Sequence, residues 1–329
     1  WKLIEISALF IPLAASIFVS RLREKSTPKK PYIIIGILGG EDKNELTPDE
    51  QALIAEPLVA GAVFHTKNHD TKIQPPDLTK MIRDANEIRQ KLGLSDFMAC
   101  IDYEGEPWSR VGGDFPVYGA LSKISEQGTL AEQETRMYTI ARDIGYAFNN
   151  YGITHILGPT LCRKSGIMSK RGLAADNQTI IKLAVAFIKG VGEFGIHAVT
   201  KHAPEGSTLE DTHFEQAIDT RPVSEVLADV SKYVDVAKAC VLPNIMLGHV
   251  VHSSLNSLPA SLSYYWHNLL RALIPGAITW TDDIGGMKGA NAGPKCAIEN
   301  PGRSNYIICM HKNPELLALL KEQRGVSLT

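Results

Sequence analysis

The chain has 329 residues, of which 44% are hydrophobic and 21% are charged, and its formal net charge is -2. Its length suits one large domain or two small ones, and its composition is that of an ordinary globular protein. Lysine and arginine are spread along the chain, which argues against a nucleic acid as partner. The five cysteines form no CxxC pair and their number is odd, so neither a disulfide scaffold nor a cysteine metal site is predicted.

Residues 1–30 differ in composition from the rest of the chain. Residues 6–19 are apolar but too few to span a bilayer as a helix, and five basic residues follow. Two interpretations stay open. As an amphipathic helix lying on the domain, the segment fits a cytoplasmic protein; as an export signal or anchor, it implies membrane attachment and a periplasmic or membrane-anchored protein. We therefore treat residues 1–30 as an N-terminal extension and residues 31–329 as one domain.

From residue 31 onward, short apolar runs alternate with amphipathic stretches, which predicts strands alternating with helices. The predicted strands are residues 32–38, 61–65, 97–101, 153–157, 196–200, 244–248, 277–281 and 306–310. The predicted helices are residues 48–55, 78–91, 130–151, 179–194, 223–239, 262–273 and 314–322. Eight such strands predict a (β/α)8 TIM barrel.

The rival fold is a doubly wound open sheet. It is disfavoured because no glycine-rich phosphate-binding loop follows the first strand: Gly36, Gly39 and Gly40 have the wrong spacing for one. The seventh helix of the barrel is the irregular one. Residues 289–303 contain Pro294, Pro301 and several glycines, so this element is expected to be short or broken.

Polar side chains follow the predicted strands at the points where chemistry gathers in such barrels. Asp211 and His213 lie on the segment after the fifth strand, where a carboxylate can orient an imidazole for proton transfer near neutral pH. The other polar residues at these strand ends and the segments after them are Asp102, Glu104, Arg171, Lys201, His202, His249, Asp282 and Asp283. We expect them to converge on one mouth of the barrel.

Several motifs at these positions resemble glycoside hydrolase family three, and in particular its single-domain bacterial β-N-acetylglucosaminidases. Residues 101–105 read I-D-Y-E-G and match the I-D-x-E-G signature of that family. Lys201-His202-x-Pro204 followed by Asp211-Thr-His213 matches a second element. Residues 281–283 read T-D-D, and the M-K-G-A of residues 287–290 follows with one extra residue between them. The resemblance runs from about residue 33 to residue 322.

The resemblance implies a retaining glycosidase without a metal or an organic cofactor. Asp282 would attack the anomeric carbon, and His213, oriented by Asp211, would protonate the leaving oxygen and then activate water. The implied substrate is a small carbohydrate, a GlcNAc-containing glycan or muropeptide of the kind released during cell-wall recycling. The residues expected to bind it are Asp102, Arg110, Arg171, Lys201, His202 and His249.

The chain also departs from the family pattern. Glu205 and Gly206 replace the glycine and histidine expected after K-H-x-P, and Cys162 stands where aspartate is usual. An arginine of the I-D-x-E-G-G-R signature is missing, and Arg110 is the candidate to replace it. Two alternatives therefore stay open beside the leading reading. One is a β-glucosidase or phosphorolytic relative, and the other is a catalytically dead, envelope-anchored sugar-binding protein.

Overall fold

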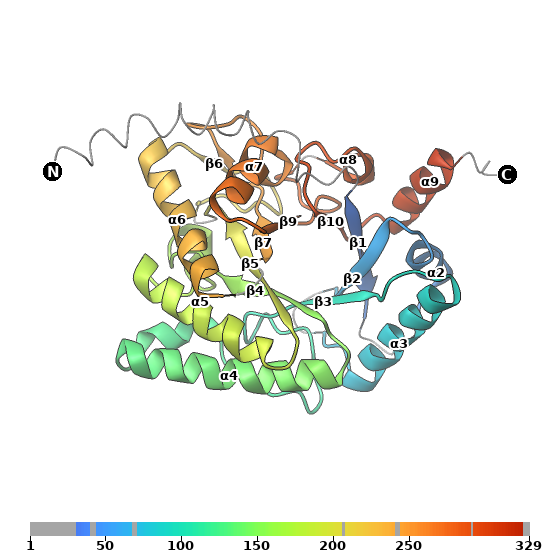
Figure 1. The fold of residues 1–329 in the computed structure, drawn as a ribbon, viewed down its shortest axis with the longest axis horizontal. Helices are drawn as coiled ribbons and strands as arrows, with labels where there is room; N and C mark the ends of the chain where they lie inside the picture. The colour runs from blue at the N-terminus through green and yellow to red at the C-terminus, as the bar shows by residue number, and fades with distance from the viewer. Residues whose placement is uncertain are drawn as a thin grey trace.

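Eight parallel strands close into a barrel in the computed structural model, which describes residues 31–39, 44–67, 71–205, 208–240, 244–290 and 292–324 (Figure 1). Their order around the barrel is β1-β10-β9-β7-β5-β4-β3-β2. The strands are β1 (Tyr32–Leu38), β2 (Val59–His65), β3 (Met98–Asp102), β4 (His155–Thr160), β5 (His197–Ala203), β7 (Asn244–Leu247), β9 (Ile278–Thr281) and β10 (Tyr306–Cys309). The eight predicted strands and the predicted barrel are confirmed.

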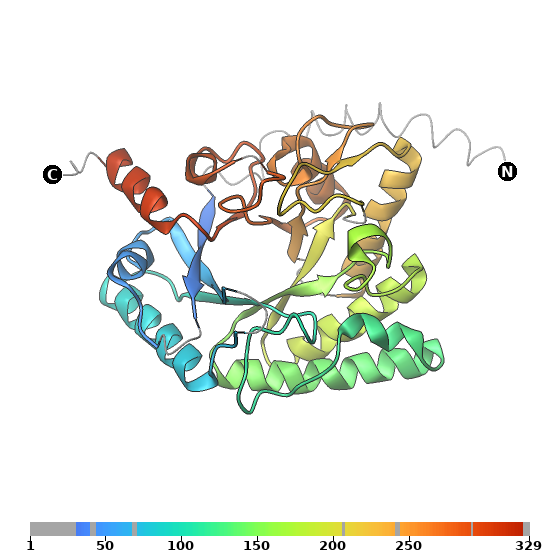
Figure 2. The ribbon, with the colours of Figure 1, turned by 180° about the vertical axis from the view of Figure 1, so that it is seen from behind.

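A helix follows each barrel strand and packs outside it, as the view from behind also shows (Figure 2). The helices are α2 (Pro48–Ile54), α3 (Pro75–Lys91), α4 (Leu130–Asn150), α5 (Asn177–Gly192), α6 (Val223–Ala239), α7 (Tyr264–Leu273), α8 (Pro294–Glu299) and α9 (Asn313–Gln323). The seventh of them, α8, is only 6 residues long. The prediction of a degenerate seventh helix is therefore confirmed.

Local capping explains where several helices begin. Thr47 and Thr129 each form a capping box with the glutamate three residues later, at the starts of α2 and α4. The side chain of Asp176 accepts a hydrogen bond from the backbone N–H of Thr179, so α5 starts before the predicted residue 179. Proline at the first turn likewise starts α3 at Pro75, ahead of the predicted residue 78.

The inside of the barrel is filled by side chains and is not a channel. Trp280 is fully buried there and donates its indole N–H to the side-chain oxygen of Asn244 over 3.1 Å. The other buried side chains of this interior cluster are Ile34, Ala60, Val63, Cys100, Leu157, Val199, Met246 and Ile308. A filled interior leaves the mouth of the barrel as the place for a site.

Two short strands lie outside the barrel and were not predicted. β6 (Ile218–Asp219) pairs in parallel with β8 (Val251–His252), which joins the segment after β5 to the segment after β7. Residues 1–30, interpreted above as an extension, lie outside the described residues, as does Gly206. Among the helices that are described, none has the length and apolar character needed to cross a membrane.

Candidate active site

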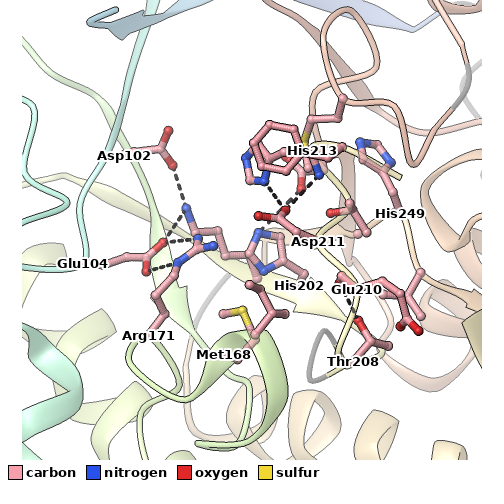
Figure 3. A pocket seen from close by; sticks show the side chains of 18 of the residues that line it. Asp102, Glu104, Met168, Arg171, His202, Thr208, Glu210, Asp211, His213 and His249 are labelled. Carbon is pink, nitrogen blue, oxygen red and sulfur yellow. Dashed lines mark hydrogen bonds and ion pairs between the residues drawn. The ribbon is translucent and has the colours of Figure 1, made fainter. Parts of the chain in front are cut away.

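A cavity of about 480 Å³ opens at the carboxyl ends of the barrel strands. Side chains from β3 and β5, and from the loops that follow β3, β4, β5, β7 and β9, reach it (Figure 3). Its volume lies in the range of small-molecule sites. All nine residues predicted to form the site line this cavity: Asp102, Arg110, Arg171, Lys201, His202, Asp211, His213, His249 and Asp282.

One wall of the cavity is an ionic cluster around Glu104. The guanidinium of Arg171 donates two hydrogen bonds to this carboxylate, over 2.8 and 2.7 Å. The ammonium of Lys201 lies 2.6 Å from Asp102 and 3.1 Å from Glu104. These contacts fix the two cations at the cavity wall, where their remaining N–H groups can meet the hydroxyl and carbonyl oxygens of a ligand.

Each charged group in this cluster stabilises the charged form of its neighbours. Burial by itself raises the pKa of Glu104, but the charges of Arg171 and Lys201 outweigh burial and hold that pKa well below its usual range. Burial by itself lowers the pKa of Lys201, yet Asp102 and Glu104 raise it above its usual value. Both cations and Glu104 are therefore ionised at neutral pH.

Asp282 follows β9 directly and lines the cavity, with 17% of its side chain exposed. One carboxylate oxygen accepts the backbone N–H of Asp283 over 2.8 Å, and the other lies 3.6 Å from Nε2 of His202. Burial raises the pKa of Asp282, but His202, His249 and the Asp283 N–H outweigh it and lower the pKa to about 2. The group is therefore an ionised carboxylate aimed into a cavity.

His202 precedes the end of β5 and faces Asp282. Burial, together with the charges of Lys201 and Arg171, outweighs the opposing effect of Asp282 and lowers the pKa of His202 to about 4. At neutral pH the ring is uncharged, so it offers one donor and one acceptor nitrogen. It can therefore bind a sugar hydroxyl or amide beside the carboxylate without neutralising it.

Asp211 and His213 form a pair on the loop after β5. Nδ1 of His213 lies 2.7 Å from the Asp211 carboxylate, which also accepts the backbone N–H of His213 over 2.9 Å. Burial raises the pKa of Asp211, but these two hydrogen bonds outweigh it and lower the pKa. The Asp211 carboxylate accepts from Nδ1–H, so Nε2 of the half-exposed ring is the nitrogen left for proton transfer at the cavity.

His249 and Asp283 stabilise the loops around the site through hydrogen bonds. Nε2 of His249 lies 2.9 Å from the carbonyl oxygen of Asp283, which can only accept, so Nε2 carries the proton and Nδ1 accepts from the hydroxyl of Ser261. The ring of His249 is thus available to a substrate only as part of the cavity wall. Asp283 accepts the backbone N–H groups of Gly285, Gly286 and Met310, and so braces the loop after β9.

Sequence reasoning missed part of the cavity lining. Trp108, Met168, Phe214 and Met287 supply apolar walls, and Phe214 is 71% exposed beside His213. Phe214 could have been suspected because it adjoins a predicted site residue, and Met287 because it belongs to the M-K-G-A motif, whereas Trp108 and Met168 carry no signal of their own. Arg110 is placed on the cavity by its loop, whose backbone carbonyl at this position accepts the N–H of Ile73 over 2.9 Å.

A parallel barrel that holds an ionised carboxylate and an Asp–His pair in one cavity at the carboxyl ends of its strands has the architecture of a barrel enzyme. The family model of the glycosyl hydrolase family 3 N-terminal domain matches residues 33–296. The chain therefore belongs to glycosyl hydrolase family 3 and is a glycoside hydrolase. This confirms the resemblance seen in the sequence motifs.

Curated relatives and solved structures agree with this assignment. The chain is 29% identical over 301 residues to a β-hexosaminidase of Haemophilus influenzae, covering 86% of this chain and 78% of that protein. It is 28% identical over 250 residues to a β-hexosaminidase of Glaesserella parasuis, covering 75% and 71%. NagZ of Neisseria gonorrhoeae in complex with N-trifluoroacetyl-D-glucosamine shares the fold, with a TM-score of 0.71, 20% identity, and coverage of 91% and 87%.

Proposed function

We propose that this protein is a retaining β-N-acetylglucosaminidase that removes terminal β-linked GlcNAc from cell-wall-derived muropeptides. The observation that carries the proposal is the ionised Asp282 in one cavity with the Asp211–His213 pair. The choice of sugar is supported by the relatives, which are β-hexosaminidases, and by NagZ of Neisseria gonorrhoeae, which was solved with an N-acylated glucosamine.

In the first step, a carboxylate oxygen of Asp282 attacks the anomeric carbon and the bond from that carbon to the leaving oxygen breaks. His213, which enters this step protonated on both ring nitrogens, gives its Nε2 proton to the leaving oxygen, while Asp211 accepts from Nδ1–H and stabilises the ring in the required orientation. In the second step, His213 takes a proton from water, whose oxygen attacks the anomeric carbon and releases Asp282. Retaining enzymes more often use a second carboxylate in this role.

The ionic cluster supplies the sugar-binding groups in this proposal. Lys201 and Arg171 are held by Glu104 and Asp102, so they present donors whose positions are set before the sugar arrives. Such preorganisation reduces the entropy lost on binding. Neutral His202, next to Asp282, would meet the side of the sugar nearest to the reacting carbon.

The test is hydrolysis of a fluorogenic β-GlcNAc glycoside beside the matching β-glucoside at neutral pH, each with and without added phosphate. We expect cleavage of the GlcNAc glycoside alone, without acceleration by phosphate. Cleavage of the glucoside would assign a β-glucosidase, acceleration by phosphate a phosphorolytic enzyme, and binding without turnover a sugar-binding protein.

The nucleophile has its own test. Asp282→Ala should lower turnover by roughly 10⁴-fold while the thermal unfolding temperature stays near that of the wild type, because the change removes the attacking atom. Asp235→Ala is the matched control, since Asp235 is an aspartate with 47% of its side chain exposed on α6, and it should retain full activity. A fully active Asp282→Ala would refute the assignment.

A further inference from the structure

The loop that carries the Asp211–His213 pair is bonded to the loop that carries Asp282. The backbone N–H of Gly289 donates to the carbonyl oxygen of Thr212 over 2.8 Å, and that of Lys288 points to the carbonyl oxygen of His213 over 3.4 Å. Both acceptors belong to the turn on which the pair sits. The segment after β9 therefore contacts the backbone of the proposed acid/base residue as well as supplying the proposed nucleophile.

This contact matters because burial does little to hold His213. Its side chain is 56% exposed, and its ring rests against Asp211 and near Phe214, which belong to the same turn. That turn is closed by its own backbone bonds, from Phe214 and Glu215 to the carbonyl oxygen of Asp211, over 3.0 and 3.1 Å. These bonds shape the turn, whereas the bond from Gly289 ties it to the barrel.

Only glycine allows this approach at position 289. A Cβ atom there would lie 2.9 Å from Cβ of Thr212, 2.9 Å from the Thr212 carbonyl oxygen and 3.1 Å from the Glu215 carbonyl oxygen. Carbon atoms in contact sit about 3.5–4.0 Å apart, so any side chain would push the turn away. Two of these atoms are backbone oxygens and the third is a Cβ atom, whose position the backbone fixes, so no change of side-chain rotamer moves any of them.

We propose that Gly289 is a positioning residue that sets His213 against the glycosidic oxygen by docking the turn of residues 211–215. The inference rests on the proposed function, because it assigns Gly289 a part in the proton transfer made by His213. A displacement of about 1 Å can lower a rate by about 100-fold. Loss of the backbone contact between Gly289 and Thr212 should therefore slow the reaction steps that need the proton of His213.

The experiment compares kcat/KM of Gly289→Ala and wild type on phenyl and 2,4-dinitrophenyl β-N-acetylglucosaminides. The phenolate needs a proton to leave, whereas the dinitrophenolate leaves without one, and kcat/KM reports the step in which it leaves. We expect a fall of about 100-fold on the phenyl glycoside and less than about threefold on the dinitrophenyl glycoside. Azide, which attacks the glycosyl-enzyme without a base, should restore kcat on the dinitrophenyl substrate.

The matched control is Gly192→Ala at the end of α5. A Cβ atom at this exposed glycine meets nothing within 4 Å, so both substrates should be cleaved as by the wild type. Equal falls of Gly289→Ala on both substrates, or no fall, would overturn the inference. A wild type inactive on both substrates would instead refute the proposed function.

A measurement on the wild-type protein keeps the inference testable if Gly289→Ala fails to fold. The Gly289 amide should exchange its hydrogen slowly in the folded protein, because it is bonded to Thr212. If this amide exchanged as fast as in an unfolded peptide, the hydrogen bond from Gly289 to Thr212 would not form in solution, and the inference would also be overturned.

Discussion

Glu104 is a buried carboxylate that touches no proposed reacting atom, yet it contacts two of the proposed sugar-binding cations. It accepts two hydrogen bonds from Arg171 and lies 3.1 Å from Lys201. Removing a charge from such a cluster leaves buried cations less well compensated, which costs more than a surface ion pair does. Its effect on the reaction should therefore appear in substrate binding.

We expect Glu104→Gln to raise KM for the GlcNAc glycoside by about 10-fold or more, with a smaller change in kcat, because Arg171 and Lys201 lose the group that orients them. Steady-state kinetics would measure both constants. The matched control is Glu106→Gln on the same loop, whose partner is Lys72 and whose side chain is 30% exposed outside the cavity. An unchanged KM in Glu104→Gln would contradict the proposed part of the cluster in binding.

The residues around the site differ in how far the sequence could predict them. The nine predicted residues share one cavity because parallel strands end on the same side of a barrel, which strand order alone implies. The pairing of Glu104 with Arg171 joins positions 67 apart in the chain and depends on how the loop after β4 folds back. Sequence spacing predicts contacts within a helix or between neighbouring strands, but not between two such distant loops, so this pairing could not be predicted.

At the scale of elements, the apolar runs predicted all eight barrel strands, since buried parallel strands are apolar on both faces. The strands β6 and β8 were missed because each has only two residues and neither forms an apolar run. Asp219 of β6 is held by Arg221 and by His252 of β8, so polar contacts define this small sheet. Hydrophobic periodicity carries no information about such an element.

An ionic network joins the loop after β5 to helix α6, and its lysine and both of its carboxylates are buried. Lys232 of α6 is fully buried, is paired with Glu205 and lies 3.9 Å from Asp229. Arg163 bonds Asp229 over 3.0 Å and lies 3.8 Å from Glu205. Glu205 is a departure from the family pattern, and its burial beside Lys232 gives it a structural reason.

We expect Lys232→Met to lower the free energy of unfolding by about 3–5 kcal/mol, because the buried Glu205 loses its nearest cation. Lys238→Met is the matched control on the same helix. Lys238 pairs with Asp235 at the surface, with 70% of its side chain exposed, so its loss should cost less than about 1 kcal/mol. Urea denaturation would measure both, and equal stabilities of the two variants would contradict a network held together by Lys232.

Several histidines across the molecule are enclosed by the fold and are uncharged at neutral pH. Burial is the largest cause in each case, and it lowers the pKa of His65 and His202 to about 4 and that of His155 and His267 to about 3. The ring of His267, for example, bonds the Thr279 hydroxyl and the backbone carbonyl of Ser261, and the residue is fully buried. Because the folded state keeps these histidines unprotonated, the stability of the whole fold depends on pH.

The sign of that coupling follows from the two states. An unfolded histidine takes up a proton below about pH 6.5, whereas these four histidines in the folded protein do so only near pH 3 to 4. Between these limits the unfolded state binds more protons, so stability falls as pH falls, by up to about 1.4 kcal/mol per pH unit for each histidine. His311 opposes this in part, because its hydrogen bond to Asp283 raises its pKa.

We therefore expect the thermal unfolding temperature to drop between pH 7 and pH 5, before the carboxylates of the site are protonated. His155→Gln removes one histidine that takes up a proton in the unfolded state but not in the folded state. The difference in unfolding free energy between the two pH values should therefore shrink by about 1–2 kcal/mol. Its stability at pH 7 can fall as well, since His155 packs against Trp280, and only the difference between pH values is diagnostic. Thermal and urea unfolding at both pH values measure these quantities. An unfolding temperature that stays level or rises at pH 5 would mean that the buried histidines accept protons in the folded protein, and hence that water reaches them.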